Sequence, residues 1–248
     1  MAAVRAHVAA RPKAVFFDVG GTLLKAHPSV GHVYADVLRR FGRKLDPLLV
    51  QSAFEAGWGA AAAPEPGGRC RFSSHPGGEL GFWRQLINRV LSEAGDDAKL
   101  GDEEFATIHR ELSRPDRYRL FPDTLPVLSR LRAAGVTLAV VSNWDGRLPA
   151  LLDGLGVARY FSAAVVSGIE GREKPAPEMF ARACAQLSVA PGEVLHVGDA
   201  ERDDYQGARA AGLEALLLDR SGQARGGHVI HDLVQVLARL GVADAEVA

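Results

Sequence analysis

At 248 residues with 47% hydrophobic side chains, the chain is long enough to bury a substantial core, which excludes disorder as its main state. It carries 29 Lys and Arg against 30 Asp and Glu. This near-neutral balance gives no bulk attraction to nucleic acid or to an anionic membrane, so we expect neither as a partner.

The two cysteines and the first residues of the chain point to an ordinary reducing compartment. Cys70 and Cys184 are too few for a disulfide framework and lack the spacing of a metal site, so we expect free thiols. Residues 1–13 contain no apolar run long enough for a signal-peptide core, and no stretch of about 18 apolar residues could span a membrane. We expect a flexible N-terminal tail over residues 1–13 and a cytoplasmic protein.

Four short apolar runs predict strands that are covered on both faces, as in a parallel sheet. They are residues 14–19, 136–142, 163–167 and 194–198. A fifth run, residues 213–218, is predicted as an edge strand. Helical patterns separate the runs, at residues 123–134, 147–155, 177–187 and 203–211. This alternation predicts right-handed crossovers and a Rossmann-like, doubly wound α/β sheet.

The segment between the first two strands has a different character. From residue 27 to 115 no run resembles a strand, and helical patterns occur at residues 30–41, 47–58, 80–93 and 102–112. Residues 60–78 are rich in Gly, Pro and Ser and are predicted as a long loop. We therefore expect a core of residues 14–26 and 116–248, with a helical insertion at residues 27–115.

The strongest candidate motif is Asp18-Val19-Gly20-Gly21-Thr22, directly after the first strand. Ligands of open α/β sheets bind at the carboxyl ends of strands, so a carboxylate here is placed for chemistry. The string alone also fits the first phosphate loop of sugar kinases with the actin-like fold.

Two further candidates follow later strands. Ser142-Asn143 can offer a hydroxyl and a backbone N–H to a phosphoryl oxygen, although Ser142 could instead cap the next helix. Lys174 precedes Pro175, whose ring restricts the backbone and would hold the ammonium in place. A fixed ammonium neutralises carboxylates and phosphates, whereas a lone lysine is normally a solvated surface charge.

The last candidates are aspartates after the strand at residues 194–198. Asp199 at the strand end suits a hard cation such as Mg²⁺, which prefers carboxylate oxygens. Asp203 and Asp204 lie in the first turn of a helix, where acids also favour the helix dipole. We expect Asp204 to support the site from behind the metal ligands and Asp203 to be solvated.

Taken together, the order Asp, Ser, Lys, Asp at successive strand ends resembles the four motifs of the haloacid dehalogenase superfamily, over about residues 14–218. The sugar-kinase alternative needs a β-hairpin meander after Asp18, whereas residues 27–28 lead into helices. The resemblance implies a Rossmann-like core and, for residues 27–115, a mobile α-helical cap of the C1 type.

The resemblance also implies roles for these residues. Asp18 would attack the phosphorus of a small phosphorylated molecule and form an aspartyl-phosphate. Mg²⁺ would be held by Asp18, Asp199 and the carbonyl of Gly20. The phosphoryl oxygens would be bound by Ser142, the N–H of Asn143 and Lys174. Thr22 and Asp204 would support this set from outside it.

Gly20 departs from the pattern, because phosphatases of this superfamily carry there a second Asp that acts as general acid and base. Such assistance is worth roughly 10²- to 10⁴-fold, so an otherwise intact site would be slow rather than dead. Three functions stay open: a slow phosphatase, a phosphate-binding protein without turnover, and a 2-haloacid dehalogenase. The retained Asp199 argues against the dehalogenase. A phosphatase predicts that Gly20→Asp raises turnover.

Several other side chains could have either a structural or a functional role. The aromatic residues of the insertion could contact substrate but more often fill a helix-bundle core; they are Phe54, Trp58, Phe82 and Trp83. Arg69, Arg71 and His75 are expected to be solvated loop charges, and His196 to be satisfied by neighbouring backbone. Trp144 either lines the entrance of the site or packs in the core. The sequence predicts no oligomeric state.

Overall fold

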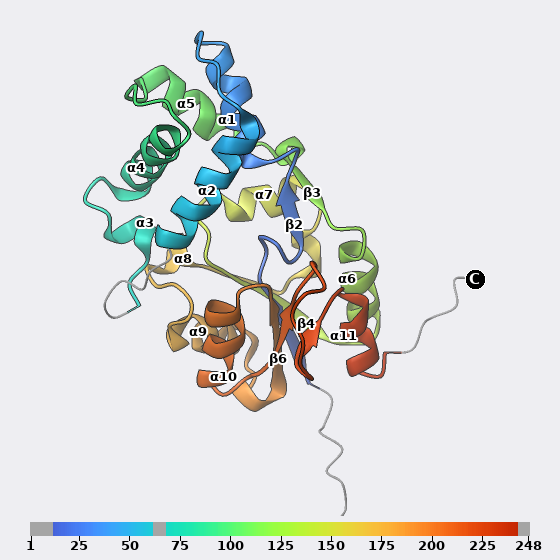
Figure 1. Ribbon diagram of the computed structural model, residues 1–248. Helices are drawn as coiled ribbons and strands as arrows, with labels where there is room; N and C mark the ends of the chain where they lie inside the picture. Colours follow the sequence, from blue (N-terminus) through green and yellow to red (C-terminus); the bar gives the residue numbers. More distant parts are fainter. Residues whose placement is uncertain (1–11, 62–67, 243–248) are drawn as a thin grey trace, which may run out of the picture.

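A six-stranded parallel sheet forms the centre of the protein (Figure 1). The structure is a computed structural model and describes residues 12–61 and 68–242, so most of the tail predicted at residues 1–13 lies outside the described residues. The strands run in the order β5-β4-β1-β6-β7-β8. Their bounds are β1 Ala14–Phe17, β4 Thr137–Ser142, β5 Ala163–Val166, β6 Val194–Gly198, β7 Glu214–Leu218 and β8 Val229–Ile230. The predicted doubly wound α/β class is confirmed.

The strand at residues 214–218 is not an edge strand, so that prediction was wrong. Leu217 and Leu218 pair with Val229 and Ile230 of β8, which covers the outer side of β7. A run of two residues is too short to give a periodic signal, which is why β8 was not foreseen.

Side chains of a strand point alternately to the two faces of the sheet. Because these strands are apolar on both faces, helices cover both. Phe16 of β1 packs with Phe180 on one face, and Phe17 packs with Leu128 on the other. In Figure 1, α9 and α10 lie on one side of the strands and α6 and α11 on the other. The core helices are α6 Thr124–Ala133, α7 Leu148–Gly154, α8 Ser167–Glu170, α9 Pro177–Leu187, α10 Gly207–Ala210 and α11 Val234–Arg239. A π-helical turn, Glu201–Gln206, precedes α10, and 3-10 turns occur at Pro115–Arg117, Ala158–Tyr160 and Pro191–Glu193.

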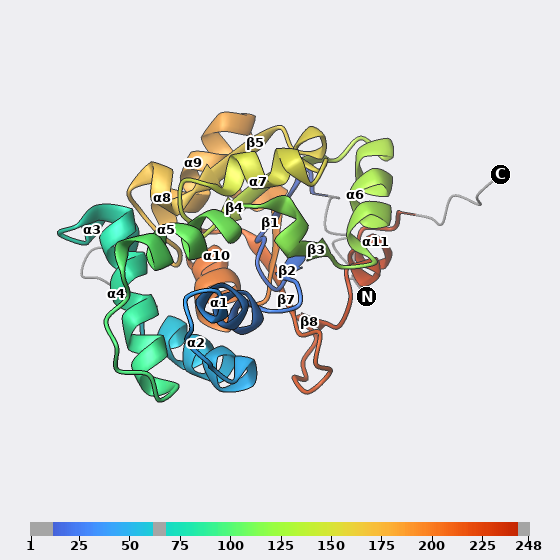
Figure 2. The same ribbon diagram turned by 90° about the horizontal axis from the view of Figure 1, so that it is seen from above.

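Five helices form a separate group, here called the helical module, at residues 30–111. They are α1 Val30–Arg39, α2 Pro47–Ala61, α3 Arg71–Ser74, α4 Gly78–Glu93 and α5 Asp102–Glu111. Figure 2 shows α1 beside α2, and α2 next to α4. The module has its own core, in which residues such as Tyr34, Ile87 and Ile108 are buried. Residues 60–78 are less loop-like than predicted, because α2 extends to Ala61 and α3 lies within them; residues 62–67 are outside the described residues.

A small antiparallel pair joins the module to the sheet. β2 Leu24–Ala26 pairs with β3 Tyr118–Leu120, and this pair was not predicted. The chain therefore leaves for the module and returns from it at neighbouring points. In Figure 1 the module stands over one end of the sheet.

Candidate active site

The carboxyl ends of three central strands bring the predicted residues together. Asp18 follows β1, Ser142 ends β4 and Asp199 follows β6. Since β1 lies between β4 and β6, these residues come from adjacent strands. Lys174 reaches the same point from the loop before α9, although it is 156 positions from Asp18 in sequence.

Asp18 is the centre of a buried hydrogen-bonded cluster. The hydroxyl of Ser142 donates to Oδ1 of Asp18 at 2.9 Å, and Nζ of Lys174 donates to the same oxygen at 2.8 Å. Lys174 also donates to Oδ1 of Asp204 at 2.5 Å. Lys174 is only 2% exposed, and burial alone would lower the pKa of its ammonium, yet the two carboxylates raise that pKa above its usual value. The lysine is therefore a fixed positive charge.

The carboxylate of Asp204 is held from two sides. His196 Nε2 lies 2.9 Å from its Oδ1, and the backbone N–H of Ala200 donates to its Oδ2 at 3.0 Å. Burial favours a raised pKa, but Lys174 and His196 outweigh it and lower the pKa of Asp204. The prediction for His196 was wrong, since its partner is a carboxylate and not backbone.

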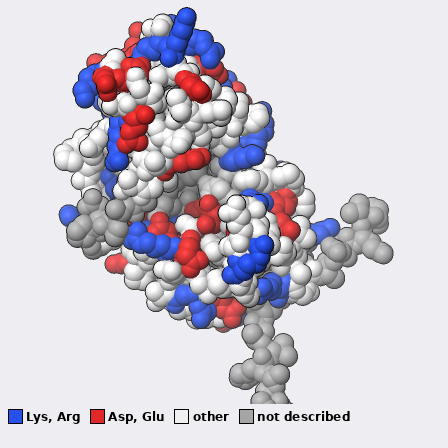
Figure 3. Space-filling model, in the orientation of Figure 1, with Lys and Arg blue, Asp and Glu red and all other residues white. Residues whose placement is uncertain are grey.

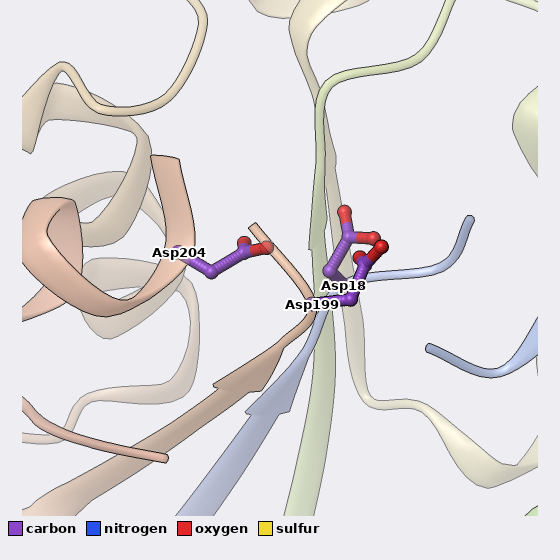
Figure 4. Close-up of side chains that lie close together, drawn as sticks. All are labelled: Asp18, Asp199 and Asp204. Carbon is purple, nitrogen blue, oxygen red and sulfur yellow. The ribbon is translucent and has the colours of Figure 1, made fainter. Parts of the chain in front are cut away.

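The residues at this edge of the sheet fit a divalent cation. Carboxylate oxygens of Asp18, Asp199 and Asp204 lie within 4.8 Å of one another. Figure 4 shows the Asp18 and Asp199 carboxylates next to each other, with Asp204 pointing toward them. Among the described residues, both hydrogen bonds accepted by the Asp18 side chain fall on Oδ1, which leaves Oδ2 available to a cation. Hard cations prefer such oxygen ligands.

Asp199 faces the open side of this cluster. Its side chain is exposed, yet the protein surrounds it on its other sides, and this desolvation together with Asp18 and Asp204 raises its pKa to about 7. The hydroxyl of Thr22 donates to its Oδ1 at 3.3 Å. Gly21, at φ +74°, passes so close that an added Cβ would lie 2.2 Å from Oδ2 of Asp199. The glycine therefore lets the loop approach this carboxylate.

The side chain of Asn143 has a role that the sequence did not reveal. It donates to the carbonyl of Lys174 at 2.9 Å and accepts from the N–H of Lys174 at 2.7 Å. This pair of hydrogen bonds fixes the backbone from which the ammonium projects. Asp203, expected to be solvated, is partly buried and accepts from Asn143 at 3.4 Å, so that expectation was wrong.

A cavity of about 570 Å³ lies between the cluster and the helical module, which is the size of a small-molecule site. Figure 3 shows the surface hollowed at this place. Asp18, Gly20, Ser142, Lys174 and Asp199 form part of its wall. The predicted residues thus share one accessible space.

The module contributes an aromatic wall to this cavity. Phe54, Trp58 and Trp83 line it and are half-buried, whereas Phe82 is buried in the core of the module. Trp58 stacks on Trp83 with ring centroids 5.8 Å apart and on Phe54 at 6.2 Å. The core interpretation favoured by the sequence holds fully for Phe82, while Phe54, Trp58 and Trp83 pack against that core and also line the cavity. A wall of this kind suits a flat, apolar group.

One buried ion pair and one hydrogen bond tie the module to the loops that carry the site. Arg71 is 5% exposed and donates to both carboxylate oxygens of Glu173 at 2.9 and 3.0 Å, so the expectation of a solvated Arg71 was wrong. Asp145 accepts from Nε1 of Trp83 at 2.9 Å and from Nε of Arg147 at 2.9 Å. Since Glu173 precedes Lys174 and Asp145 follows Trp144, each tie reaches a loop of the site.

Residues 12–212 match the family model described as haloacid dehalogenase-like hydrolase. The chain belongs to this family. Among curated relatives, haloacid dehalogenase-like hydrolase domain-containing protein 3 of Danio rerio is 30% identical over 234 residues, which cover 91% of this chain and 95% of the relative. The phosphoserine phosphatase of Thermus thermophilus is 35% identical over 140 residues, covering 56% and 55% of the two chains.

A solved structure shows the same fold. The putative HAD-hydrolase YfnB of Bacillus subtilis, bound to magnesium, superposes with a TM-score of 0.76 over 94% of this chain and 100% of its own, at 18% identity. Among the described residues of this haloacid dehalogenase-like hydrolase, the structure contains no helix long and apolar enough to cross a bilayer.

At Gly20 this family member differs from the acid/base pattern of the phosphatases, and Trp144 occupies the adjoining space. A Cβ added to Gly20 would lie 3.2 Å from Cζ3 of Trp144. Trp144 both lines the cavity and packs against Tyr118, with ring centroids 5.9 Å apart, so its two interpretations hold together. The indole must shift by a few tenths of an ångström before any side chain fits at position 20.

The tie between Arg71 and Glu173 gives a first testable prediction. Arg71→Met leaves the Glu173 carboxylate buried without its cation, which should lower the free energy of unfolding by about 3–5 kcal/mol in urea denaturation. Arg89→Met is the matched control, because its pair with Glu93 is exposed on α4. That variant should lose no more than about 1 kcal/mol. Equal losses of unfolding free energy in the two variants would show that the buried pair stabilises the protein no more than an exposed pair does.

Proposed function

We propose that this protein is a Mg²⁺-dependent phosphatase that acts through an aspartyl-phosphate on a small phosphorylated molecule. The observation that supports this most strongly is the arrangement of Asp18, with Ser142 and Lys174 donating to one of its oxygens and Asp199 beside it at the edge of a cavity. A carboxylate nucleophile, fixed donors and an acidic cation site are the groups that this reaction requires.

In the first step, an oxygen of Asp18 bonds to phosphorus and the bond from phosphorus to the leaving group breaks. In the second, water attacks the same phosphorus, and the Asp18 carboxylate and inorganic phosphate are released. Lys174, Ser142 and the backbone N–H of Asn143 bind the phosphoryl oxygens, whose charge they balance. When bound, Mg²⁺ would be held by Asp18, Asp199 and the carbonyl of Gly20. It would neutralise the negative charge of the carboxylates and the phosphate.

Residues 27–115 serve, in this proposal, as the cap of the site. The helical module supplies the aromatic wall opposite Asp18, and the cavity lies between the two. A wall of this kind excludes water from the reacting phosphate and strengthens each electrostatic contact inside.

The metal requirement predicts the effect of Asp199→Asn. Replacing one of two carboxylate ligands should raise the Mg²⁺ concentration for half-maximal activity by at least about tenfold, because the amide has no charge to offer the cation. The measurement is phosphate release against Mg²⁺ concentration after chelation. Glu201→Gln, an exposed acid two positions further along, should leave the curve in place. An unchanged Mg²⁺ curve for Asp199→Asn would remove Asp199 from the metal site.

Gly20 and Trp144 favour one alternative, a phosphate-binding protein without turnover, because no side chain at position 20 can act as acid or base. Inorganic phosphate would then raise the melting temperature while a broad panel of phosphate esters, with Mg²⁺, released no phosphate. Mg²⁺-dependent release of phosphate from any of these esters would instead support the phosphatase and rule out a protein that only binds phosphate. Asp199 beside Asp18 continues to count against a dehalogenase, which would instead release chloride from 2-chloropropionate without Mg²⁺.

A further inference from the structure

The ring of Trp144 lies against Gly20, and two hydrogen bonds hold the backbone from which this ring projects. The carbonyl of Trp144 accepts from the N–H of Gly168 at 2.9 Å and from the hydroxyl of Ser167 at 3.0 Å. Its ring packs on Tyr118 and over Gly20. An indole N–H donates hydrogen bonds but does not give up its proton in water. The wall at position 20 therefore offers no acid to a leaving group.

The phenolic and guanidinium groups of the described cavity wall do not replace that acid. The Tyr118 hydroxyl already donates to the carbonyl of Leu112 at 2.8 Å, and burial raises its pKa to about 12. Arg71 and Arg147 are guanidinium groups, which stay protonated. Lys25 is exposed at the cavity wall, with its ammonium 5.7 Å from the centroid of the Phe121 ring, and is a group to test as a substitute acid.

Three carboxylates line the cavity outside the Asp18 cluster, and each has another partner. Asp145 is fully buried and bound to Arg147 and Trp83. Glu55 accepts from Gln51 on the same helix at 2.8 Å, and Asp203 accepts from the Asn143 side chain. Glu55, Asp203 and Lys25 are the groups to test as substitute acids.

The opposite wall of the cavity is aromatic. Four rings of the module, those of Phe54, Trp58, Phe72 and Trp83, line it. The rings of Trp58 and Trp83 are stacked within 9° of parallel, and the ring centroids of Phe72 and Trp83 are 5.8 Å apart. The guanidinium groups of Arg71 and Arg147 lie over the rings of Trp58 and Trp83, 4.8 and 5.5 Å from the ring centroids, so these faces are partly covered. The parts of such rings that face the cavity pack on flat apolar groups with little cost in conformational entropy.

We propose that the substrate of this site is an aryl phosphate, a phosphate carried on a phenolic oxygen, and this proposal rests on the phosphatase function above. Asp18 forms a bond to phosphorus, the bond between phosphorus and the phenolic oxygen breaks, and its electron pair leaves on that oxygen as phenolate. A phenol ionises near pH 10, far below an alkyl alcohol, so the phenolate departs without an acid and takes its proton from solvent. Water then hydrolyses the aspartyl-phosphate and releases one proton to solvent.

The test compares phenyl phosphate with benzyl phosphate, in the presence of Mg²⁺. Both carry one aromatic ring, but benzyl phosphate has an alkyl leaving group. We expect kcat/KM for benzyl phosphate to be lower by at least about 100-fold, since assistance by an acid is worth that much. Phenylphosphonate should also inhibit more strongly than methylphosphonate, and Trp58→Leu should remove that difference without changing inhibition by inorganic phosphate.

A pair of double variants isolates the missing acid. Gly20→Asp with Trp144→Phe supplies a carboxyl group and the room for it, whereas Gly20→Asn with Trp144→Phe supplies the same shape without an acid. The first should have a ratio of kcat/KM for benzyl phosphate to kcat/KM for phenyl phosphate that is higher than in the second by on the order of tenfold or more. Circular dichroism and the melting temperature show whether both variants are folded.

Similar kcat/KM values for phenyl and benzyl phosphate in the natural protein would overturn the aryl phosphate proposal while the phosphatase stands. So would a selective loss of benzyl phosphate hydrolysis in Glu55→Gln, Asp203→Asn or Lys25→Met, since that residue would then be the acid. If even 4-nitrophenyl phosphate releases no phosphate and does not label Asp18, the phosphatase function itself is refuted.

Discussion

Asp18→Asn is expected to lower kcat for phosphate release by about 10⁴-fold or more, because the amide cannot form the covalent intermediate that divides the reaction into two easier steps. Steady-state phosphate release on 4-nitrophenyl phosphate with Mg²⁺ measures this directly. The side chain keeps its shape, and the amide oxygen can still accept from Ser142 and Lys174.

The fold should survive this substitution. Burial and the neighbouring Asp204 both disfavour the charged form of Asp18, while Lys174 favours it, so loss of the charge removes repulsion as well as attraction. We expect a melting temperature close to that of the natural protein. Asp36→Asn, on the exposed side of α1, is the control and should keep full activity. An Asp18→Asn protein that is folded and retains more than a trace of activity would contradict the role of Asp18.

Lys174→Met is expected to damage both activity and stability. The ammonium is shared by Asp18 and Asp204, and its removal leaves two buried carboxylates without their cation. Breaking a buried pair in this way costs about 3–5 kcal/mol of unfolding free energy, and loss of a fixed donor to the reacting phosphate lowers kcat about 10²- to 10³-fold. Urea denaturation and steady-state kinetics measure the two effects separately.

Lys13→Met provides the control for Lys174, because Lys13 pairs with Glu193 at the surface with its side chain 67% exposed. That change should leave both the denaturation midpoint and kcat nearly where they are. If Lys174→Met loses activity but no stability, Lys174 is a phosphate-binding group whose charge the fold does not need. If Lys174→Met loses neither activity nor stability, the roles assigned to Lys174 in catalysis and in the fold are both wrong.

The sheet was predictable because its strands are continuous apolar runs. The segment Ala14–Phe17 is apolar and buried along its whole length, so its hydrophobicity is enough to predict a strand without information from other parts of the chain. β8 and α3 were missed for the opposite reason. Two residues of β8 acquire strand geometry only by pairing with β7, and α3 is a single turn between Cys70 and His75. Such elements depend on tertiary contacts and not on local pattern.

The candidate site was predictable where chemistry follows directly from a strand end. Asp18, Ser142 and Asp199 needed only the rule that parallel strands present their carboxyl ends at one edge. The hydrogen bonds and ion pairs that hold these residues in place were not predictable, because they join residues far apart in sequence. Arg71 and Glu173 are 102 positions apart, and neither has a local signal of the partner.

The contact between Trp144 and Gly20 illustrates the same limit. The missing side chain at position 20 is evident from the sequence, but the ring that fills its space is more than a hundred positions away. Only the packing of β1 beside β4 brings the two loops together.

The most direct measurement is a peptide map of the protein quenched in acid while it turns over 4-nitrophenyl phosphate with Mg²⁺. Without an acid or base at position 20, hydrolysis of the intermediate should be slow enough for it to accumulate. We expect a phosphoryl group on the peptide that contains Asp18, sensitive to hydroxylamine and absent from Asp18→Asn. Turnover without a phosphoryl group on Asp18, or with one on another residue, would contradict the account.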